Sequence, residues 1–188
     1  MGCTWRNSIH EPSRLWPCTT FLDVYICFFL RYISRCFASL LMYFFPAMQI
    51  MLTTCFIGFA DGTSHRTHNL ASSAWVLYTP TYSLLWQVGV CIGLATNNHV
   101  EYVAVTGLLG DVVHIDICNL QVHLDSQLIV AQLNGFYTVC NTILWCRYLL
   151  IHLLCRHFDT ITFVHIPRCD NASIDHIANQ LLDCNLLH

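Results

Sequence analysis

The sequence predicts an α/β fold in which a five-stranded mixed sheet, three antiparallel strands plus two parallel ones, is flanked by helices. Three observations lead to this prediction. Three short apolar segments follow one another, later strand-like segments alternate with segments of helical periodicity, and the few acidic residues fall near the ends of these segments. Strands joined by turns pair antiparallel, whereas strands joined by helices favour parallel pairing. We expect this domain to occupy residues 53–188.

The first three strands are predicted at residues 55–60, 74–78 and 84–92. Each segment is apolar, short and bounded by polar residues, glycine or proline, which is typical of strands. Asp61 and Gly62 follow the first segment as a turn signal, so we expect the first strand to end there. The short connections between the three segments predict antiparallel hairpins.

A helix is predicted after the third strand, because apolar residues from Val100 to Val112 recur at helical spacing. Asn98 is the expected N-cap, with Glu101 three residues further on as its capping partner. Beyond this helix the sequence predicts a strand at 120–124, helices at 126–133 and 142–157, a strand at 161–166, and a final helix over 174–182 opened by Asn171.

Residues 1–52 are predicted to form a hydrophobic extension, helical or disordered, outside the domain. Residues 36–60 contain no charged residue and are long enough for a membrane span. Pro46 interrupts this run and residues 53–60 serve better as a strand, which leaves about 17 residues, the lower limit for a span. We therefore favour a buried or aggregation-prone leader over membrane association through residues 36–60. No clear signal peptide opens the sequence, so we expect an intracellular protein, cytoplasmic or nuclear.

Charged residues are scarce. They make up 10% of the chain, against about 25% in an average protein, so poor solubility is expected. The basic residues are arginines without a single lysine, and the formal charge of -3 counts against tight binding of nucleic acid through overall charge. Twelve cysteines occur without a CxxC pair, so we expect free thiols and neither a zinc site nor a disulfide framework.

Four acidic residues lie at predicted element boundaries. Asp61 follows the first strand, Glu101 lies early in the first helix, Asp125 follows the fourth strand, and Asp175 lies early in the last helix. If these boundaries share one end of the sheet, the four carboxylates converge, and binding of hard cations such as Mg²⁺ would relieve their mutual repulsion. Two such ions about 4 Å apart can clamp the attacking and leaving oxygens of a phosphoryl displacement. The pattern therefore indicates phosphodiester hydrolysis.

The segments around these acids resemble one known family. The matching motifs are Phe59-Ala60-Asp61-Gly62-Thr63-Ser64, Thr96-Asn97-Asn98-His99-Val100-Glu101-Tyr102, Leu124-Asp125-Ser126-Gln127-Leu128-Ile129-Val130, and His165-Ile166-Pro167-Arg168 followed by Asn171 and Asp175. Together they resemble the type 1 ribonuclease H domain, in the variant found in plant LTR retrotransposon polyproteins, where it is associated with a reverse transcriptase. The resemblance covers residues 55–188. Four motifs in the right order are far more specific than any one of them.

This resemblance implies a function and a site. It implies that Asp61, Glu101, Asp125 and Asp175 hold two Mg²⁺ ions, with Mn²⁺ as a possible substitute, and that a monomeric domain cuts the RNA strand of an RNA/DNA hybrid. It further implies that the substrate is approached by Gly62, Ser64, Asn97, Asn98, Ser126, Gln127 and Arg168. Taken singly, several of these residues have a structural interpretation, since Asn98 with Glu101 and Asn171 with Asp175 suit helix caps and first turns.

The sequence also departs from the family. The loop before the last carboxylate reads Arg168-Cys169-Asp170, where many members carry a histidine, so that role is not transferred. Residues 55–188 hold four arginines against nine acidic residues, a formal charge of -5, which predicts weak, salt-sensitive hybrid binding. The segment 142–157, expected to be arginine-rich, contains cysteine, histidine and tryptophan, which arginine codons yield after single transitions at methylated CpG sites. We hypothesise a degenerate retrotransposon-derived copy; the alternative function is a catalytically inert, nucleic-acid-binding remnant.

Overall fold

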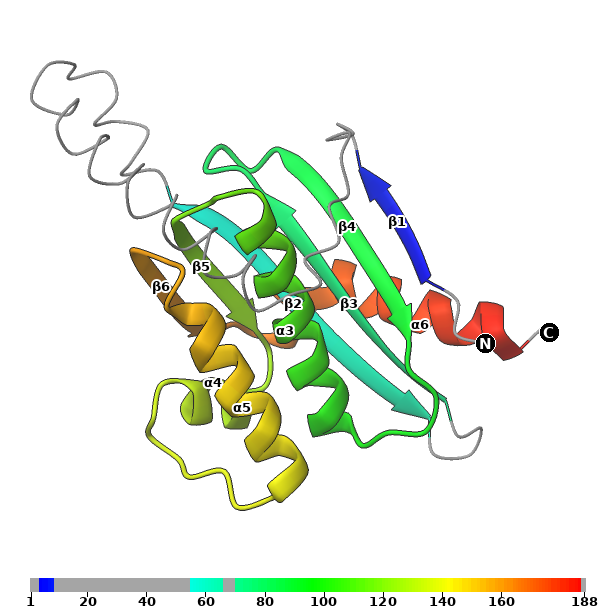
Figure 1. Ribbon diagram of the computed structural model, residues 1–188. Helices are drawn as coiled ribbons and strands as arrows, with labels where there is room; N and C mark the ends of the chain where they lie inside the picture. Colours follow the sequence, from blue (N-terminus) through cyan, green and yellow to red (C-terminus); the bar gives the residue numbers. More distant parts are fainter. Residues whose placement is uncertain (1–3, 9–54, 66–69, 187–188) are drawn as a thin grey trace, which may run out of the picture. The chain divides into compact units, whose positions relative to one another are not determined.

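The computed structural model describes residues 4–8, 55–65 and 70–186, which contain one mixed sheet of six strands in the order β1-β4-β3-β2-β5-β6 (Figure 1). The strands are β1 (Thr4–Ser8), β2 (Phe56–His65), β3 (Leu70–Tyr78), β4 (Leu84–Cys91), β5 (Asn119–Leu124) and β6 (Thr160–His165). Strand β3 pairs antiparallel with β2 and β4, whereas β5 pairs parallel with β2 and β6. The predicted arrangement of three antiparallel and two parallel strands is therefore confirmed.

Strand β1 is an addition that the sequence did not predict. Thr4–Ser8 pairs antiparallel with β4, from Thr4 opposite Val90 to Ser8 opposite Trp86, and so forms an edge of the sheet. These residues were assigned to the extension, because a strand of five residues without alternating apolar positions carries no local signal. Its pairing is a long-range event, set by an unpaired edge of β4.

Strand β2 is longer than predicted. It continues through Asp61 and Gly62 to His65, and these residues pair with β3, so the predicted turn at Asp61-Gly62 is wrong. An Asp-Gly pair is a turn signal when no partner strand competes for its backbone groups. Here β3 provides a continuous ladder, with Asp61 opposite Ala74 and Gly62 opposite Ser73.

The helices are α3 (Asn97–His114), α4 (Gln127–Leu133), α5 (Thr142–Cys155) and α6 (Ala172–Leu186), with a 3-10 turn η1 (Arg168–Asn171) before α6. The N-cap of α3 is Thr96, whose hydroxyl accepts a hydrogen bond from the His99 backbone, so the predicted Asn98 cap is wrong. Glu101 consequently lies in the second turn and not the first. Asn171 is the last residue of η1 and stands directly before α6, as predicted, but its fully buried side chain makes no capping hydrogen bond.

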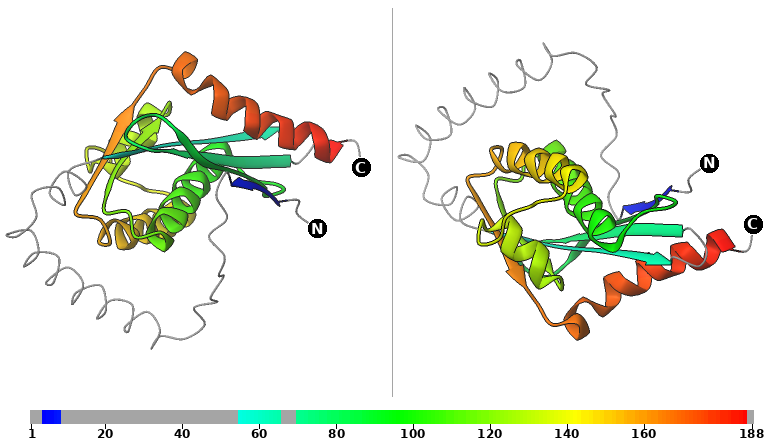
Figure 2. Two further views of the ribbon diagram at one scale, coloured as in Figure 1. Left: turned by 90° about the horizontal axis from the view of Figure 1, so that it is seen from above. Right: turned by 90° about the horizontal axis from the view of Figure 1, so that it is seen from below.

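Two apolar clusters hold the helices to opposite faces of the sheet (Figure 2). The larger cluster joins α3, α4 and α5 to one face and includes the fully buried Tyr102, Leu108 and Ile129. The smaller one packs Ile174 and Ala178 of α6 against Val76 on the other face. Each large apolar side chain buried in this way contributes about 1.5–3 kcal/mol. The sheet is therefore a rigid platform with helices on both sides.

The apolar segment 36–54 lies outside the described residues, and so does the rest of the predicted extension apart from β1. Within the part of the chain that the structure describes, no helix combines the length and the hydrophobicity that a bilayer crossing requires.

Candidate active site

The candidate site lies where strands β2 and β5 separate. Their parallel pairing runs from Phe56 to Phe59 of β2 and stops opposite His123. Strand β2 then continues with Asp61, while β5 ends at Leu124 and the chain turns into α4 after Asp125. Both carboxylates therefore flank an opening at the carboxyl end of two parallel strands, the place where open α/β sheets present their ligand-binding residues.

Helix α3 brings Glu101 to this opening because Gly62 lets the helix approach the strand. A Cβ atom at position 62 would lie 2.5 Å from the carbonyl carbon of Val100 and 2.6 Å from the backbone nitrogen of Glu101. Only glycine leaves room for that contact. The buried Ser73 hydroxyl also donates a 2.6 Å hydrogen bond to the Val100 carbonyl oxygen. The position of Glu101 relative to Asp61 is thus fixed through the backbone of Val100.

The fourth carboxylate comes from the opposite face of the sheet. Asp175 lies in the first turn of α6, which is anchored by the buried Ser72 hydroxyl donating a 2.6 Å hydrogen bond to the Ala178 carbonyl. Asp175 is linked to the opening through Arg168. The Arg168 Nη2 atom lies 3.4 Å from Asp175 Oδ1, and its Nε atom lies 4.0 Å from Asp125 Oδ2.

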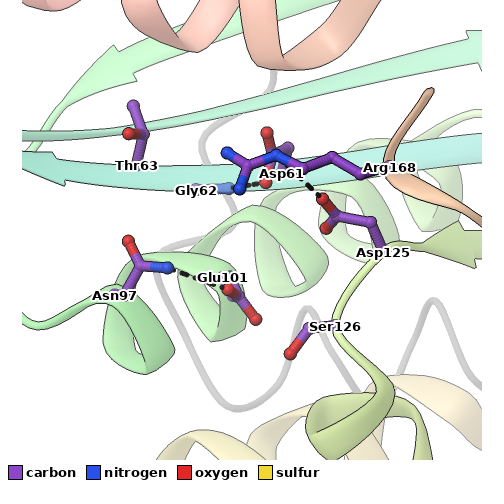
Figure 3. A pocket seen from close by; sticks show the side chains of 8 residues that line it. All are labelled: Asp61, Gly62, Thr63, Asn97, Glu101, Asp125, Ser126 and Arg168. Atoms are coloured by element: carbon purple, nitrogen blue, oxygen red, sulfur yellow. Dashed lines mark hydrogen bonds and ion pairs between the residues drawn. The ribbon is translucent and has the colours of Figure 1, made fainter. Parts of the chain in front are cut away.

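These elements enclose a polar pocket of about 210 Å³ (Figure 3). The lining residues are Asp61, Gly62, Thr63, Asn97, Glu101, Asp125, Ser126 and Arg168. Carboxylates from β2, α3 and the end of β5 meet here, with the Arg168 side chain extending from its loop toward Asp125. Residues more than 100 positions apart in the chain therefore form one site.

The structure brings most of the predicted site residues together. Asn97 donates a hydrogen bond to Glu101 Oε1 at 3.3 Å and accepts one from the Ser64 hydroxyl at 3.4 Å. Four of the predicted site residues do not line the pocket, although each is next to a lining residue in the sequence or contacts one: Ser64, Asn98, Gln127 and Asp175. Thr63 lines the pocket and was missed as a site residue. Its signal was alternation along β2, which places Thr63 on the same face as Asp61.

Two of the carboxyl groups have strongly raised pKa values. Burial raises the pKa of Asp61 to about 7, and the nearby Asp125 adds to the effect, while the Gly62 backbone N–H that donates to Asp61 opposes it. Burial also raises the pKa of Glu101 to about 7, with Asp125 adding to it and the Ser126 hydroxyl and Arg168 opposing it. Near neutral pH both groups are therefore only partly ionised, whereas each would be fully charged at its ordinary pKa.

The donor set of the pocket suits a hard divalent cation. Every acidic side chain offers carboxylate oxygens, and the buried Oε2 atom of Glu101 has no hydrogen-bond partner. Cations such as Mg²⁺ and Mn²⁺ prefer oxygen ligands and would offset the burial that chiefly raises the two pKa values, together with the repulsion from Asp125 that adds to it. In the side-chain arrangement of the described residues, no three His, Cys, Asp or Glu side chains are gathered closely enough to hold a metal ion. Binding would thus require the carboxylates to draw together.

A family model described as reverse transcriptase-like matches residues 59–181. A mixed sheet of this order, with helices on both faces and acidic residues where its parallel strands part, defines the class of ribonuclease H-like folds, which solved ribonuclease H structures share. The chain belongs to the reverse transcriptase-like family of ribonuclease H-like domains.

Several relatives carry ribonuclease H names. Ribonuclease HI of Halobacterium salinarum is 31% identical over 123 residues, covering 65% of this chain and 62% of that protein. The N-terminal ribonuclease H domain of Rv2228c from Mycobacterium tuberculosis has a TM-score of 0.67 at 30% identity, covering 70% of this chain and 96% of that chain. LC11-RNase H1, isolated from compost, was solved in complex with an RNA/DNA hybrid. It has a TM-score of 0.66 at 29% identity, and the match covers 70% of this chain and 99% of that chain. This chain spans 62% of the halobacterial relative and 34% of the full-length Rv2228c protein.

Proposed function

We propose that this domain is a ribonuclease H that hydrolyses the RNA strand of RNA/DNA hybrids, acting as a monomer inside the cell. One observation carries the proposal: Asp61, Glu101 and Asp125, from three separate elements, line a single pocket where β2 and β5 part. The solved complex of a relative with an RNA/DNA hybrid supports the choice of substrate. In this proposal Asp61, Glu101, Asp125 and Asp175 are the catalytic residues.

The same four carboxylates would hold two Mg²⁺ ions, and Mn²⁺ would substitute. Bound there, such cations would offset the developing charge on the scissile phosphate and would lower the pKa of an attacking water. Asp61 of β2 and Asp125, directly after β5, would hold them. Glu101 orients the water and accepts its proton, because its buried Oε2 atom has no hydrogen-bond partner among the described residues. Asp175 completes the set from α6.

The polar residues around the acids would recognise the hybrid. Asn97 and Ser126 line the pocket, and Asn98 and Gln127 follow them directly, in the first turns of α3 and α4. Short polar side chains at such positions can read a ribose 2′-hydroxyl in a shallow minor groove, which distinguishes RNA from DNA. Gly62 and Ser64 contribute backbone and hydroxyl groups of β2, and Arg168 offers a charged fork suited to a phosphate.

Cleavage of a labelled RNA/DNA hybrid tests this function. With Mg²⁺ the chain should nick the RNA strand and leave duplex DNA of the same sequence intact. Asp61→Asn should abolish nicking, because it removes one anchoring charge from the pocket. Asp159→Asn, which makes the same change at an exposed carboxylate outside the pocket, should not. Nicking that survives Asp61→Asn unchanged would reject the site.

We further propose that this copy derives from an LTR retrotransposon of the plant type and has degenerated. Helix α5 supports this origin, since Trp145, Cys146 and His152 occupy a helix in which we expected arginines, and Trp145 is exposed. Intact genomic relatives should encode arginine at several of these positions. Intact copies that encode the same cysteine, histidine and tryptophan residues would contradict the origin by CpG decay.

The alternative function is a catalytically inert remnant that keeps the fold and binds hybrid or cation without turnover. The formal charge of -5 over residues 55–188 favours it, because phosphate contacts supply much of the affinity for nucleic acid. NMR separates the two functions: Mg²⁺ that shifts the carboxylate signals without any cleavage of hybrid supports the inert remnant, whereas cleavage excludes it.

A further inference from the structure

The pocket already contains a positive charge that belongs to the chain. Arg168 lines it together with Asp61, Glu101 and Asp125, and its guanidinium spans the distance between Asp125 and Asp175. One side of the fork lies 4.0 Å from Asp125 and the other donates a 3.4 Å hydrogen bond to Asp175. These two carboxylates come from the end of β5 and from α6, so the guanidinium links both faces of the sheet.

The ion pairs that Arg168 makes with the two carboxylates are long and exposed to solvent. Its side chain is 78% exposed, whereas those of Asp125 and Asp175 are 14% and 27% exposed. Both distances are long for a charge-assisted hydrogen bond, and an exposed ion pair of this kind is weak and screened by salt. The guanidinium can therefore leave for solvent at little cost, while the carboxylates stay at the mouth of the pocket.

From these contacts we propose that Arg168 is an exchangeable counter-cation: it bridges Asp125 and Asp175 in the cation-free protein and is displaced when a divalent cation binds the same carboxylates. This inference rests on the cation site in the proposed function. It assigns to Arg168 a role in setting cation affinity, in addition to the phosphate contact proposed above.

Repulsion between the divalent cation and the guanidinium forces Arg168 to leave, and the length of its side chain allows it to do so. A divalent cation at Asp125 and Asp175 and a guanidinium on the same oxygens would repel each other at a separation of a few ångströms, so both cannot stay. Arg168 lies on the one-turn helix η1 directly after Pro167, and the flexible part is its long side chain. Once displaced, the guanidinium remains tethered at the pocket mouth, where a phosphate of the bound strand would be its next partner.

Titration of the full chain with Mn²⁺, followed by the electron paramagnetic resonance signal of the free ion, tests the exchange without any cleavage. Removing the competing charge in Arg168→Gln should tighten Mn²⁺ binding about tenfold. Arg168→Lys keeps a charge but loses the fork that spans both carboxylates, so its affinity should lie between those of the two other proteins. Arg156→Gln removes an arginine outside the pocket and should bind like the unmodified protein.

Each outcome decides a different point. Tighter binding in Arg168→Gln and intermediate binding in Arg168→Lys establish the exchange. If the unmodified protein binds Mn²⁺ and both variants bind it equally or more weakly, Arg168 is no competitor and the inference is overturned, while the cation site stands. If Arg168→Gln does not fold, as shown by its circular dichroism spectrum, the affinity of Arg168→Lys decides in the same way. If no folded protein binds Mn²⁺, the inference and the cation-dependent function fail together.

Discussion

Replacing Asp61 with asparagine should stabilise the cation-free protein while removing its activity. The Asp61 carboxyl group is 6% exposed, and its pKa rises from 3.8 to about 7 on folding. Between these values the unfolded chain carries the charge and the folded protein holds the proton. Each rise of one pH unit therefore costs the folded state about 1.4 kcal/mol, up to about 4 kcal/mol above pH 7. Asparagine carries no charge at any pH, so the folded variant does not lose this stability as the pH rises.

The assay is thermal unfolding in EDTA, followed by circular dichroism. The variant should be more stable by roughly 1–2 kcal/mol at pH 5 and by roughly 4 kcal/mol at pH 8, where its melting temperature should be higher by about 10 °C. Saturating Mg²⁺ at pH 8 should raise the melting temperature of the unmodified protein far more than that of Asp61→Asn. A variant less stable than the unmodified protein at pH 8, or a stability difference independent of pH, would refute the electrostatic reasoning.

Three further predictions concern the groups that place and ionise Glu101. Gly62→Ala should destabilise the domain by about 2–3 kcal/mol in urea unfolding, because the added Cβ atom would clash with the backbone of Val100. Gly110→Ala is the control: its Cβ atom would meet nothing within 4 Å, so it should stabilise helix α3 by about 0.5–1 kcal/mol. Equal effects of the two substitutions on the free energy of unfolding would contradict the close approach of α3 to Gly62. Ser73→Ala should cost about 1 kcal/mol, because it removes the buried hydrogen bond from the Ser73 hydroxyl to the Val100 carbonyl oxygen; a variant as stable as the unmodified protein would count against that anchor. The affinity for Mg²⁺ should rise with pH as Glu101 loses its proton, because its pKa is about 7 in the cation-free protein, and an affinity that does not change between acidic and alkaline pH would exclude this ionisation as part of cation binding.

The direction in which β2 to β6 pair was predictable because it follows from the connections between them. Short polar links between the first three segments force hairpins, and helical segments between the later ones force parallel crossovers. The four acidic residues were predictable candidates because charged residues are rare in this chain. Asp61, Glu101 and Asp125 line one pocket because β2 and β5 are neighbours and α3 packs against β2.

The errors have a common physical cause, which is that tertiary contacts override local signals. Asp61-Gly62 has the composition of a turn, but the ladder with β3 keeps it extended and the glycine serves the contact with α3. Thr96, Asn97 and Asn98 are three good N-caps in a row, and only the packing of α3 selects the first. The contacts of Arg168 join elements that sequence periodicity cannot place relative to one another.

A crystal of the protein soaked in Mn²⁺ gives the most direct test of the central claim, because anomalous scattering locates the ion without reference to catalysis. The proposed function predicts anomalous peaks in the pocket, within coordination distance of oxygens of Asp61, Glu101 and Asp125. A pocket without such a peak at saturating Mn²⁺, in a crystal where these side chains are ordered, would contradict it.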